Sequence, residues 1–431
     1  MARVAKLLAA SLVAGMVCVG CVPGTSGTDT TQQTAQKSGE PVTVEFWTIN
    51  LKKNYGEYVE GLIDGFEKSH EDITIKWVDV PGTDVESKLL AALATDDVPD
   101  AVNIEDMRVD QFGESLSDLT PYFDQDELAP YIDGLVESVR RDDKLLAIPW
   151  YNGGAPVAWY NSSLLQEAGV GTDDLPETWD EALDLGQQVA QRTDACAFNA
   201  LPTLDVLLSN GAEPLSADRT KPALNTPENA QVLEKFRAAY KDGTICPGAV
   251  SENIRNLPQT VANGMAAASV DGLPFQLLDI EKNAAKTYTD LAVGHAVTGT
   301  TGDFIIGGMQ TFAIPAKSDV KEQAAEFIEY VTSAEAQLEF CKLVTIFPST
   351  KDTLEDPFFT DVEVKSPADA ARKAVVEELP KVKTKDLGTK VDLELDEAYL
   401  ERIRAYMTGD QAAADALADV EQDWTDLLSK K

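Results

Sequence analysis

The chain has 431 residues, 44% of them hydrophobic and 25% charged, which is the composition of a globular protein long enough for two domains or more. Its 36 Lys and Arg against 73 Asp and Glu give a formal net charge of -37, and a surface this acidic repels phosphate backbones and argues against nucleic-acid binding. Only two histidines are present, so a histidine-rich zinc site and a histidine-dependent catalytic triad are both disfavoured.

Residues 1–20 have the pattern of a secretory signal peptide. Arg3 and Lys6 form a short basic region, and the apolar stretch 7–20 follows it. This stretch is shorter than the roughly 20 residues that a membrane-spanning helix needs. We therefore expect the protein to be exported.

The signal peptide is followed by a candidate lipid anchor. Cys18-Val19-Gly20-Cys21 resembles a bacterial lipobox with Cys21 as the lipidated residue, although Cys18 stands where the motif prefers Leu. The alternative is an ordinary cleaved signal with an incidental cysteine. Residues 21–41 are rich in Thr, Ser, Gln and Gly without any aromatic residue, so they are expected to form a flexible tether. A lipidated Cys21 would hold the exported protein at the outer face of the cytoplasmic membrane.

Hydrophobic strands alternate with amphipathic helices from residue 42 onward. Strands are expected at 42–47, 73–78 and 99–104 with helices between them, and this order predicts a parallel sheet with right-handed crossovers. A further strand at 145–149 runs into 150–154, where two glycines lie between prolines. Such a segment predicts a crossing from a first lobe to a second one.

A second α/β unit is expected to begin with the strand at 157–160. The capping box Thr178-x-x-Glu181 predicts the start of a long helix, and 265–270 is predicted to be a strand of small residues. After 291–293 the chain is expected to return to the first lobe with a strand at 311–315. The remaining C-terminal part is expected to be helical and highly charged.

Three cysteines remain in the mature chain, Cys196, Cys246 and Cys341. Export places them in a compartment that permits disulfides, and they allow three different single pairings. Cys196 lies in a strand-like segment and Cys246 follows a helix and a turn. We expect these two to pair and Cys341 to stay free and buried. None of the three has the spacing of a metal site, so no metal is expected.

Short sequence blocks in this order resemble those of the extracellular solute-binding proteins of family 1, the sugar-binding lipoproteins of bacterial ABC importers. The resemblance covers roughly residues 42–350. It rests on Phe66-Glu67-Lys68, Val98-Pro99-Asp100, Ile148-Pro149-Trp150, Trp159-Tyr160-Asn161, Ala168-Gly169-Val170, Glu177-Thr178-Trp179-Asp180-Glu181, Asn210-Gly211, Ala223-Leu224-Asn225, Asn263-Gly264-Met265-Ala266-Ala267, Gly307-Gly308, Ala313-Ile314, Ala324-Ala325-Glu326-Phe327, Ser333-Ala334-Glu335-Ala336-Gln337 and Pro348-Ser349-Thr350.

This resemblance implies an α/β, two-lobed periplasmic-binding-protein (Venus-flytrap) fold of type II-like topology, whose lobes are joined by a hinge. Lobe 1 would comprise 42–151 and 288–343, and lobe 2 would comprise 152–287 and 344–431 with the C-terminal helices. The implied function is that of the substrate-binding component of an ABC importer, which closes over a mono- or oligosaccharide and has no enzymatic activity and no cofactor. Its partners would be the carbohydrate, the permease subunits in the membrane and, indirectly, their cytoplasmic ATPase; the protein itself is expected to be a monomer.

A sugar site needs aromatic rings that stack on the sugar, and carboxylates or amides that pair with its hydroxyls. Such residues are expected where parallel strands end in a crevice, where the chain crosses between the lobes, and where glycine lets backbone approach a ligand. The aromatics compete with a role in the core or the hinge, and the acidic pair after the third strand competes with a solvated loop. The candidate ligand-binding residues are Trp47, Asn50, Glu105, Asp106, Trp150, Tyr151, Asn152, Asp271, Gly307, Gly308, Met309 and Phe347.

Two other classes of function stay open from the residues alone. Acidic side chains flanked by aromatics also suit a polyamine or another cationic or polar solute. An exported glycoside hydrolase needs only two suitably spaced carboxyl groups, which a chain with 73 acidic residues supplies by chance. The acidic run 392–396 lacks the glycine turn of a calcium-binding EF-hand loop and is better explained as a solvated helix face.

Overall fold

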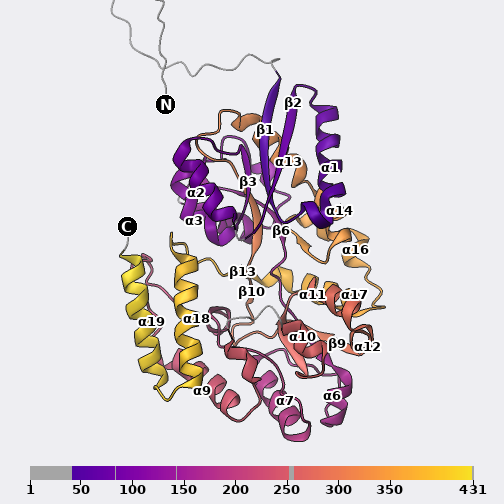
Figure 1. Ribbon diagram of the computed structural model, residues 1–431, viewed down its shortest axis with the longest axis vertical. Helices are drawn as coiled ribbons and strands as arrows, with labels where there is room; N and C mark the ends of the chain where they lie inside the picture. Colours follow the sequence, from indigo (N-terminus) through magenta and orange to yellow (C-terminus); the bar gives the residue numbers. More distant parts are fainter. Residues whose placement is uncertain (1–40, 83, 142, 252–256, 430–431) are drawn as a thin grey trace, which may run out of the picture. The chain divides into compact units, whose positions relative to one another are not determined.

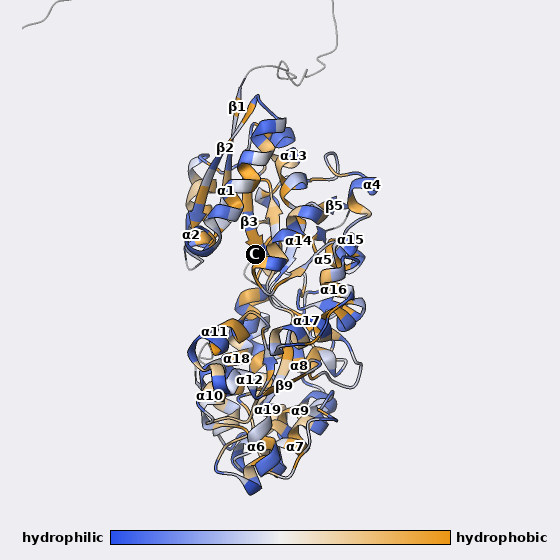
Figure 2. Ribbon diagram, turned by 90° about the vertical axis from the view of Figure 1, so that its right-hand side faces the viewer, coloured by the Kyte–Doolittle hydropathy of each residue, from blue (hydrophilic) through white to orange (hydrophobic). Residues whose placement is uncertain are grey.

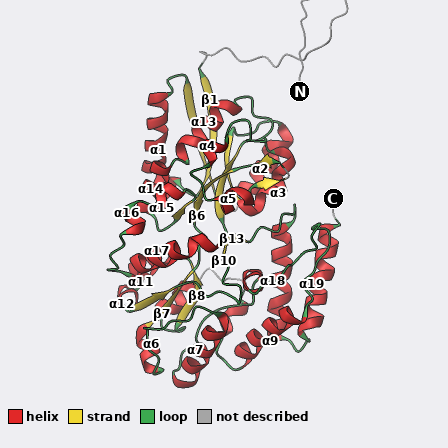
Figure 3. Ribbon diagram, turned by 180° about the vertical axis from the view of Figure 1, so that it is seen from behind, coloured by secondary structure: helices red, strands yellow, loops and turns green. Residues whose placement is uncertain are grey.

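A computed structural model describes residues 41–82, 84–141, 143–251 and 257–429 (Figure 1). The expected signal peptide, Cys21 and all of the expected tether except Pro41 lie outside the described residues. Residues 41–431 form one compact unit, built on two separate β-sheets with helices around them (Figure 3).

The first sheet has six strands in the order β12-β6-β11-β3-β1-β2. Strand β1 pairs in parallel with β2 on one side and with β3 on the other, which confirms the parallel start predicted for the chain. The strand β11 then inserts between β3 and β6, antiparallel to both, and β12 pairs with β6 at the edge. The strands are β1 (Val42–Ile49), β2 (Ile73–Val80), β3 (Ala101–Glu105), β6 (Ile148–Asn152), β11 (Met309–Ala313) and β12 (Phe347–Pro348).

Helices with one apolar face pack on this sheet. Helix α1 (Lys52–Ser69) buries Val59, Leu62, Ile63 and Phe66, which follow a helical spacing, and the Phe66 ring lies edge-on to Phe327 at 5.0 Å. The other elements around the sheet are α2 (Val85–Thr95), η1 (Asp106–Arg108), α3 (Val109–Phe112), η2 (Gly113–Ser115), α4 (Gln125–Leu128), α5 (Asp133–Ser138), β4 (Arg140–Arg141), β5 (Lys144–Leu145), α13 (Lys321–Val331), α14 (Ala334–Leu343), α15 (Lys351–Leu354) and α16 (Pro357–Thr360).

The second sheet is smaller and antiparallel. Its central strand β7 (Val157–Asn161) lies between β8 (Ala268–Gly272) and β9 (Leu291–Gly294). The predicted capping box is confirmed, because the Thr178 and Glu181 side chains cap the start of α7 reciprocally. The elements near this sheet are α6 (Ser162–Glu167), α7 (Trp179–Arg192), α8 (Leu204–Ser209), α9 (Pro227–Lys241), η3 (Pro247–Val250), α10 (Leu257–Ala262), α11 (Gln276–Asn283), α12 (Ala285–Thr289), α17 (Pro367–Glu378) and η5 (Leu379–Lys381).

Strand pairing differs from the expected lobe boundaries at two places. The boundary at 288 assigned β9 to the first lobe, but β9 pairs with β7 in the second sheet. The boundary at 344 assigned β12 to the second lobe, but Phe347 and Pro348 pair with β6 in the first sheet. The chain therefore crosses between the sheets later than predicted after β8, and again after β12. In addition, β10 (Phe304–Ile306) and β13 (Val382–Thr384) form a parallel pair of their own.

The C-terminal helices are confirmed, and they close the core around the second sheet. Helix α18 (Asp392–Thr408) packs against α19 (Ala413–Leu428), and both contact α9 (Figure 1). Trp424 is fully buried, and its indole N–H donates a hydrogen bond to the Leu395 carbonyl at 2.8 Å. Hydrophilic and hydrophobic residues are mixed within the helices, as expected for helices that bury one face (Figure 2). None of the helices in the described ranges is both long enough and apolar enough to cross a membrane.

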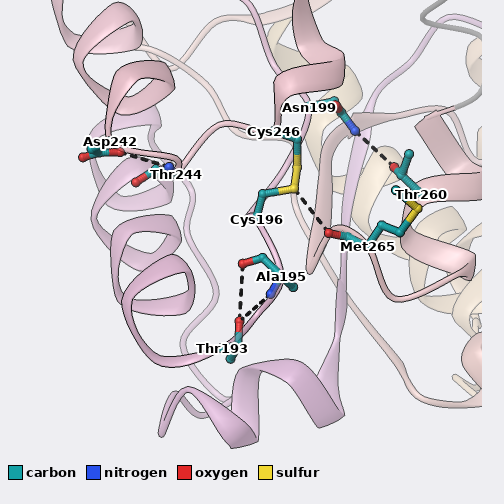
Figure 4. The surroundings of a disulfide bond; sticks show 9 residues. All are labelled: Thr193, Ala195, Cys196, Asn199, Asp242, Thr244, Cys246, Thr260 and Met265. Atoms are coloured by element: carbon teal, nitrogen blue, oxygen red, sulfur yellow. Dashed lines mark hydrogen bonds between the residues drawn. A yellow bond between two sulfur atoms is a disulfide. The ribbon is translucent and has the colours of Figure 1, made fainter.

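The predicted disulfide is confirmed, and Cys341 is free and buried. Cys196 follows α7 and Cys246 follows α9, and the disulfide joins these two segments (Figure 4). The bond closes a loop of 50 residues and so restricts the unfolded chain. The loop also contains Asn199 and α8, which brings it into the site described next.

Candidate functional site

A cavity of about 720 Å³ is lined by residues of both sheets. From the first sheet come Glu105 at the end of β3, Tyr151 in β6 and Gln310 in β11. From the second sheet comes Asp271 in β8. Further lining side chains come from α1, α8, α14 and α18 and from the connections between the sheets. A ligand in this cavity would therefore touch parts of the chain that belong to different sheets.

Aromatic rings form one part of the wall. Tyr55 of α1 and Tyr151 of β6 both lie edge-on to Phe340 of α14, with ring centroids 5.4 and 5.2 Å apart. Trp179 and Phe275 also line the cavity, and Phe275 is 38% exposed. An exposed ring in a cavity can stack on the apolar face of a ligand.

A buried lysine holds two carboxylates together at another part of the wall. The Lys385 ammonium lies 2.9 Å from Asp396 Oδ2 and 3.6 Å from Asp205 Oδ1. Burial alone would lower the pKa of Lys385, but the two carboxylates hold it above its ordinary value. Burial raises the pKa of Asp205, and Lys385 opposes that rise. One carboxylate oxygen of each aspartate, Oδ1, is buried without a hydrogen-bond partner in the described chain.

Asp271 stands near this group without a cation of its own. Its side chain is exposed to the cavity, and no described side chain donates a hydrogen bond to its carboxylate. Desolvation by the surrounding protein penalises the charged form and raises the pKa of Asp271 to about 6. The negative charge of Asp205 adds to this rise.

Helix α18 presents one face to the cavity. Asp396, Leu400 and Arg404 all line it, and their spacing of four residues places them on the same side of the helix. The Arg404 Nε is buried without a hydrogen-bond partner among the described atoms. These three residues come from the part of the chain in which the sequence indicated helices but no site.

Five of the predicted site residues are brought together in the cavity wall: Glu105, Tyr151, Asp271, Gly307 and Gly308. Gly308 adopts a φ of 70°, which favours glycine. Gly307 packs so tightly against Gly154 that a Cβ on Gly154 would lie 1.3 Å from the Gly307 carbonyl oxygen. Glycines at these positions therefore let the connecting backbone segments meet beside the cavity.

Trp150, the residue expected to contact ligand, is instead a core residue. Its side chain is 1% exposed, and its ring lies 4.5 Å from Phe312 and 5.6 Å from Phe340 between ring centroids. Alternate residues of a strand point to opposite faces, so Trp150 and Asn152 share the buried face of β6 while Tyr151 points to the cavity. Asn152 is buried too, and its Oδ1 accepts a hydrogen bond from the Gly154 N–H.

The other predicted site residues lie away from the cavity. Trp47 is buried and donates to Glu45, with the Lys88 ammonium over its ring. Asn50 is an exposed turn residue with a φ of 55°. Met309 and Phe347 are buried, and the Phe347 ring packs near Phe359. Asp106 is buried as well, in a different cluster.

The Asp106 cluster joins the first sheet to the start of α18. Arg141 donates hydrogen bonds to Asp110 and to Asp386, and Asp392 lies beside them, its carboxylate accepting backbone N–H groups of 387–389. Asp110, Asp386 and Asp392 are close enough to share a metal ion, but the Arg141 guanidinium already supplies the positive charge there. Both carboxylate oxygens of Asp106 are buried without a hydrogen-bond partner in the described residues. Burial, together with the nearby Asp386 carboxylate, raises the pKa of Asp106 to about 7.

Several lining residues escaped prediction from the sequence. The sequence around Asn199, Asp205 and Lys385 gives no sign of a site, because these residues come together only after distant segments fold. For α18, the sequence shows Asp396, Leu400 and Arg404 at steps of four residues, but charged residues at helical spacing are also usual on solvated helices. The missed lining residues that carry polar or aromatic groups are Tyr55, Trp179, Asn199, Thr203, Asp205, Ser209, Phe275, Thr298, Asp303, Phe304, Gln310, Phe340, Lys385, Asp396 and Arg404.

Comparison with known proteins gives a consistent result. A family model described as bacterial extracellular solute-binding protein matches residues 51–338. An arabinooligosaccharide-binding protein of Halalkalibacterium halodurans is 29% identical over 201 residues, 44% of each chain. An sn-glycerol-3-phosphate-binding periplasmic protein of Agrobacterium fabrum is 24% identical over 260 residues, 57% of this chain and 58% of the relative. The chain thus matches about half the length of these curated relatives.

Among solved structures, the cyclic alpha-maltosyl-1,6-maltose binding protein of Arthrobacter globiformis superimposes with a TM-score of 0.77 at 21% identity. The superposition covers 91% of this chain and 100% of that one. Because it extends over nearly the whole chain, the predicted α/β periplasmic-binding-protein fold is confirmed, including the C-terminal helices that the short sequence blocks did not reach.

Proposed function

This chain belongs to the bacterial extracellular solute-binding proteins, and on that premise we propose that it binds a mono- or oligosaccharide as the substrate-binding component of an ABC importer. The single observation that supports the saccharide is the mixed cavity wall. Aromatic rings such as Phe275 and Tyr151 and carboxylates such as Asp271 and Glu105 line the same space of about 720 Å³. Rings stack on the C–H faces of a sugar, and carboxylates accept hydrogen bonds from its hydroxyls.

Delivery to a permease follows from the way the cavity is built. Tyr151 comes from the first sheet and Asp271 from the second, so a ligand held by both gains affinity when the two parts of the chain close around it. The closed, loaded form is the state that permease subunits in the membrane would recognise, with their cytoplasmic ATPase acting indirectly. In this role the protein binds and releases its ligand as a monomer and breaks no bond.

The charges of the cavity disfavour an anionic ligand such as the glycerol phosphate of the Agrobacterium relative's name. The lining carboxylates are Glu105, Asp205, Asp271, Asp303 and Asp396, and the lining cations are Lys385 and Arg404. Lys385 is already held by two of the carboxylates. A phosphate would therefore meet more negative than positive charge. A polyamine would suit these carboxylates and is the competing ligand, whereas the aromatic wall favours a saccharide.

A panel of ligands tests this function on the purified mature protein. Arabino- and malto-oligosaccharides, sn-glycerol 3-phosphate and spermidine are compared by thermal shift, and every hit is measured by titration calorimetry. A saccharide should raise the free energy of unfolding by about 2.7 kcal/mol when present at a hundred times its Kd. Stabilisation by spermidine or glycerol phosphate alone would contradict the saccharide assignment. Release of reducing ends from a bound oligosaccharide would instead indicate a hydrolase.

We further propose that Cys21 carries a lipid that holds the exported protein at the outer face of the cytoplasmic membrane, with 21–41 as the tether. The support is the lipobox-like sequence before Cys21. In the native host, Cys21→Ser should move the protein from the membrane fraction to the soluble fraction, as measured by immunoblotting. Cys341→Ser, at the free cysteine, is the matched control and should stay at the membrane. Unchanged membrane attachment of Cys21→Ser would rule the anchor out.

A further inference from the structure

The negative charge and the unpartnered oxygens at one end of the cavity restrict which chemical groups the ligand has there. We infer that the bound saccharide bears a protonated amino group, and that this ammonium is held by Asp271 together with Asp205 and Asp396. We call these three residues the carboxylate end of the cavity. The inference rests on the proposed saccharide-binding function and adds to it the chemical class of the sugar, an amino saccharide.

Charge balance is the first argument. The carboxylate end contains three carboxylates, and among the residues that the structure describes the one cation paired with any of them is Lys385, which lies 2.9 Å from Asp396 and 3.6 Å from Asp205. No described cation pairs with Asp271. Closing the cavity over a ligand removes water from these groups, and a charge that is buried without a partner is costly. A ligand ammonium removes this cost, whereas a neutral hydroxyl does so only in part.

The positions of the free acceptors are the second argument. Asp205 Oδ1 and Asp396 Oδ1 accept no hydrogen bond within the described chain, although Asp205 Oδ1 lies 3.6 Å from the Lys385 ammonium, and the Asp271 carboxylate is open to the cavity. An ammonium has three donors and no acceptor, so it suits a site that presents only acceptors. A hydroxyl brings an acceptor of its own, for which Lys385 is the nearby donor but is already held by two carboxylates.

The remaining charged groups of the cavity do not supply the missing cation. Asp303 is paired with Lys383, at 2.7 Å. Glu105 comes from the other sheet and adds negative charge. Arg404 also lines the cavity, but none of the three carboxylates of the carboxylate end forms an ion pair with it.

Proton exchange gives the inference a signature that does not depend on affinity. The pKa of Asp271 lies at about 6 in the free protein, so the group is partly protonated at pH 6. An incoming ammonium stabilises the carboxylate, lowers this pKa and releases protons on binding. A neutral sugar displaces water, raises the pKa and takes protons up. Calorimetry at pH 6 in two buffers of different ionisation enthalpy shows whether protons are released or taken up when the ligand binds.

The experiment compares matched pairs of probes that differ in the amino group. Glucosamine, galactosamine and mannosamine are set against glucose, galactose and mannose, and chitosan oligosaccharides against cello-oligosaccharides and N-acetylated chitin oligosaccharides. Spermidine is included as an ammonium without a sugar. We expect at least one amino saccharide to bind about 10-fold or more tightly than its neutral counterparts, with release of protons.

Variants of the protein complete the test. Asp271→Asn should lose about 10-fold or more in affinity for the amino saccharide and abolish the proton release, and Asp271→Glu should restore part of both. Asp184→Asn changes the same charge on an exposed position of α7 and should bind as the unaltered protein does. The folded state of each variant is checked by its melting temperature.

Each result has one meaning. Neutral saccharides that bind as well as their amino counterparts, or that take protons up while Asp271→Asn binds normally, would overturn the inference and leave the proposed function intact. Binding of spermidine without any saccharide would overturn both the amino-saccharide inference and the proposed saccharide function. If no amino probe binds, the inference is wrong.

Discussion

Replacing Trp150 by alanine should lower the free energy of unfolding by about 3–5 kcal/mol, the usual cost of deleting a large aromatic side chain from a packed core. The ring is fully enclosed and packs against Phe312 and Phe340, which connect β11 and α14 to β6. Its removal leaves a void that the surrounding strands cannot fill without shifting. Urea unfolding followed by circular dichroism measures the loss.

A second aromatic provides the matched control for Trp150. Phe275→Ala removes a ring that is exposed at the cavity, so the free energy of unfolding should change little while ligand affinity falls. The fraction of Trp150→Ala that remains folded should bind ligand. If Trp150→Ala instead kept its stability and lost binding, the ring would have to face the ligand, as its position at the crossover suggested from the sequence.

Asp106→Asn should change how stability depends on pH. In the folded protein the pKa of Asp106 is raised to about 7, whereas an unfolded aspartate ionises near pH 4, so between these values the folded state binds a proton that the unfolded state does not. Stability therefore falls as the pH rises through this window. Asn does not titrate, so the variant lacks this pH dependence. Between pH 5 and pH 8 its free energy of unfolding should fall by about 2–3 kcal/mol less than that of the unaltered protein.

The comparison for Asp106 uses thermal and urea unfolding at several pH values. Asp64→Asn makes the same substitution at an exposed position of α1 and should leave the pH profile as it is. Parallel pH profiles for Asp106→Asn and the unaltered protein would mean that Asp106 is ionised in the folded state. A cation would then have to reach its two unpartnered oxygens.

The fold could be predicted from the sequence because its signals are local. Strands such as β1 and helices such as α1 have the hydrophobic spacing of their kind, and the capping box at Thr178 and Glu181 determines where α7 begins. The disulfide between Cys196 and Cys246 was chosen among three pairings by the type of segment on either side. The lobe boundaries were misplaced because β9 and β12 are short, and the sheet that a short strand joins depends on tertiary packing.

The site was predicted only in part, and β6 shows why. The sequence indicated the segment that reaches the cavity, but not which face of the strand meets it. A shift of one residue exchanges the buried face for the exposed one, so Tyr151 lines the cavity while Trp150 and Asn152 support the core. An alternation of polar and apolar residues along a strand would show which face is buried. β6 has only five residues, all apolar or aromatic except Asn152, so its sequence shows no such alternation.

The cavity face of α18 also bears on how such a protein acquires a new ligand. The sequence match to the family ends at residue 338, whereas Asp396, Leu400 and Arg404 come from a helix that begins at Asp392. All strands of the two sheets except β12 come before residue 338, so the sheets and the helix that supplies part of the cavity wall are largely encoded in separate stretches of the gene. Changes in the last stretch can therefore alter the side chains that line the cavity while leaving the strands of both sheets, apart from β12, unchanged.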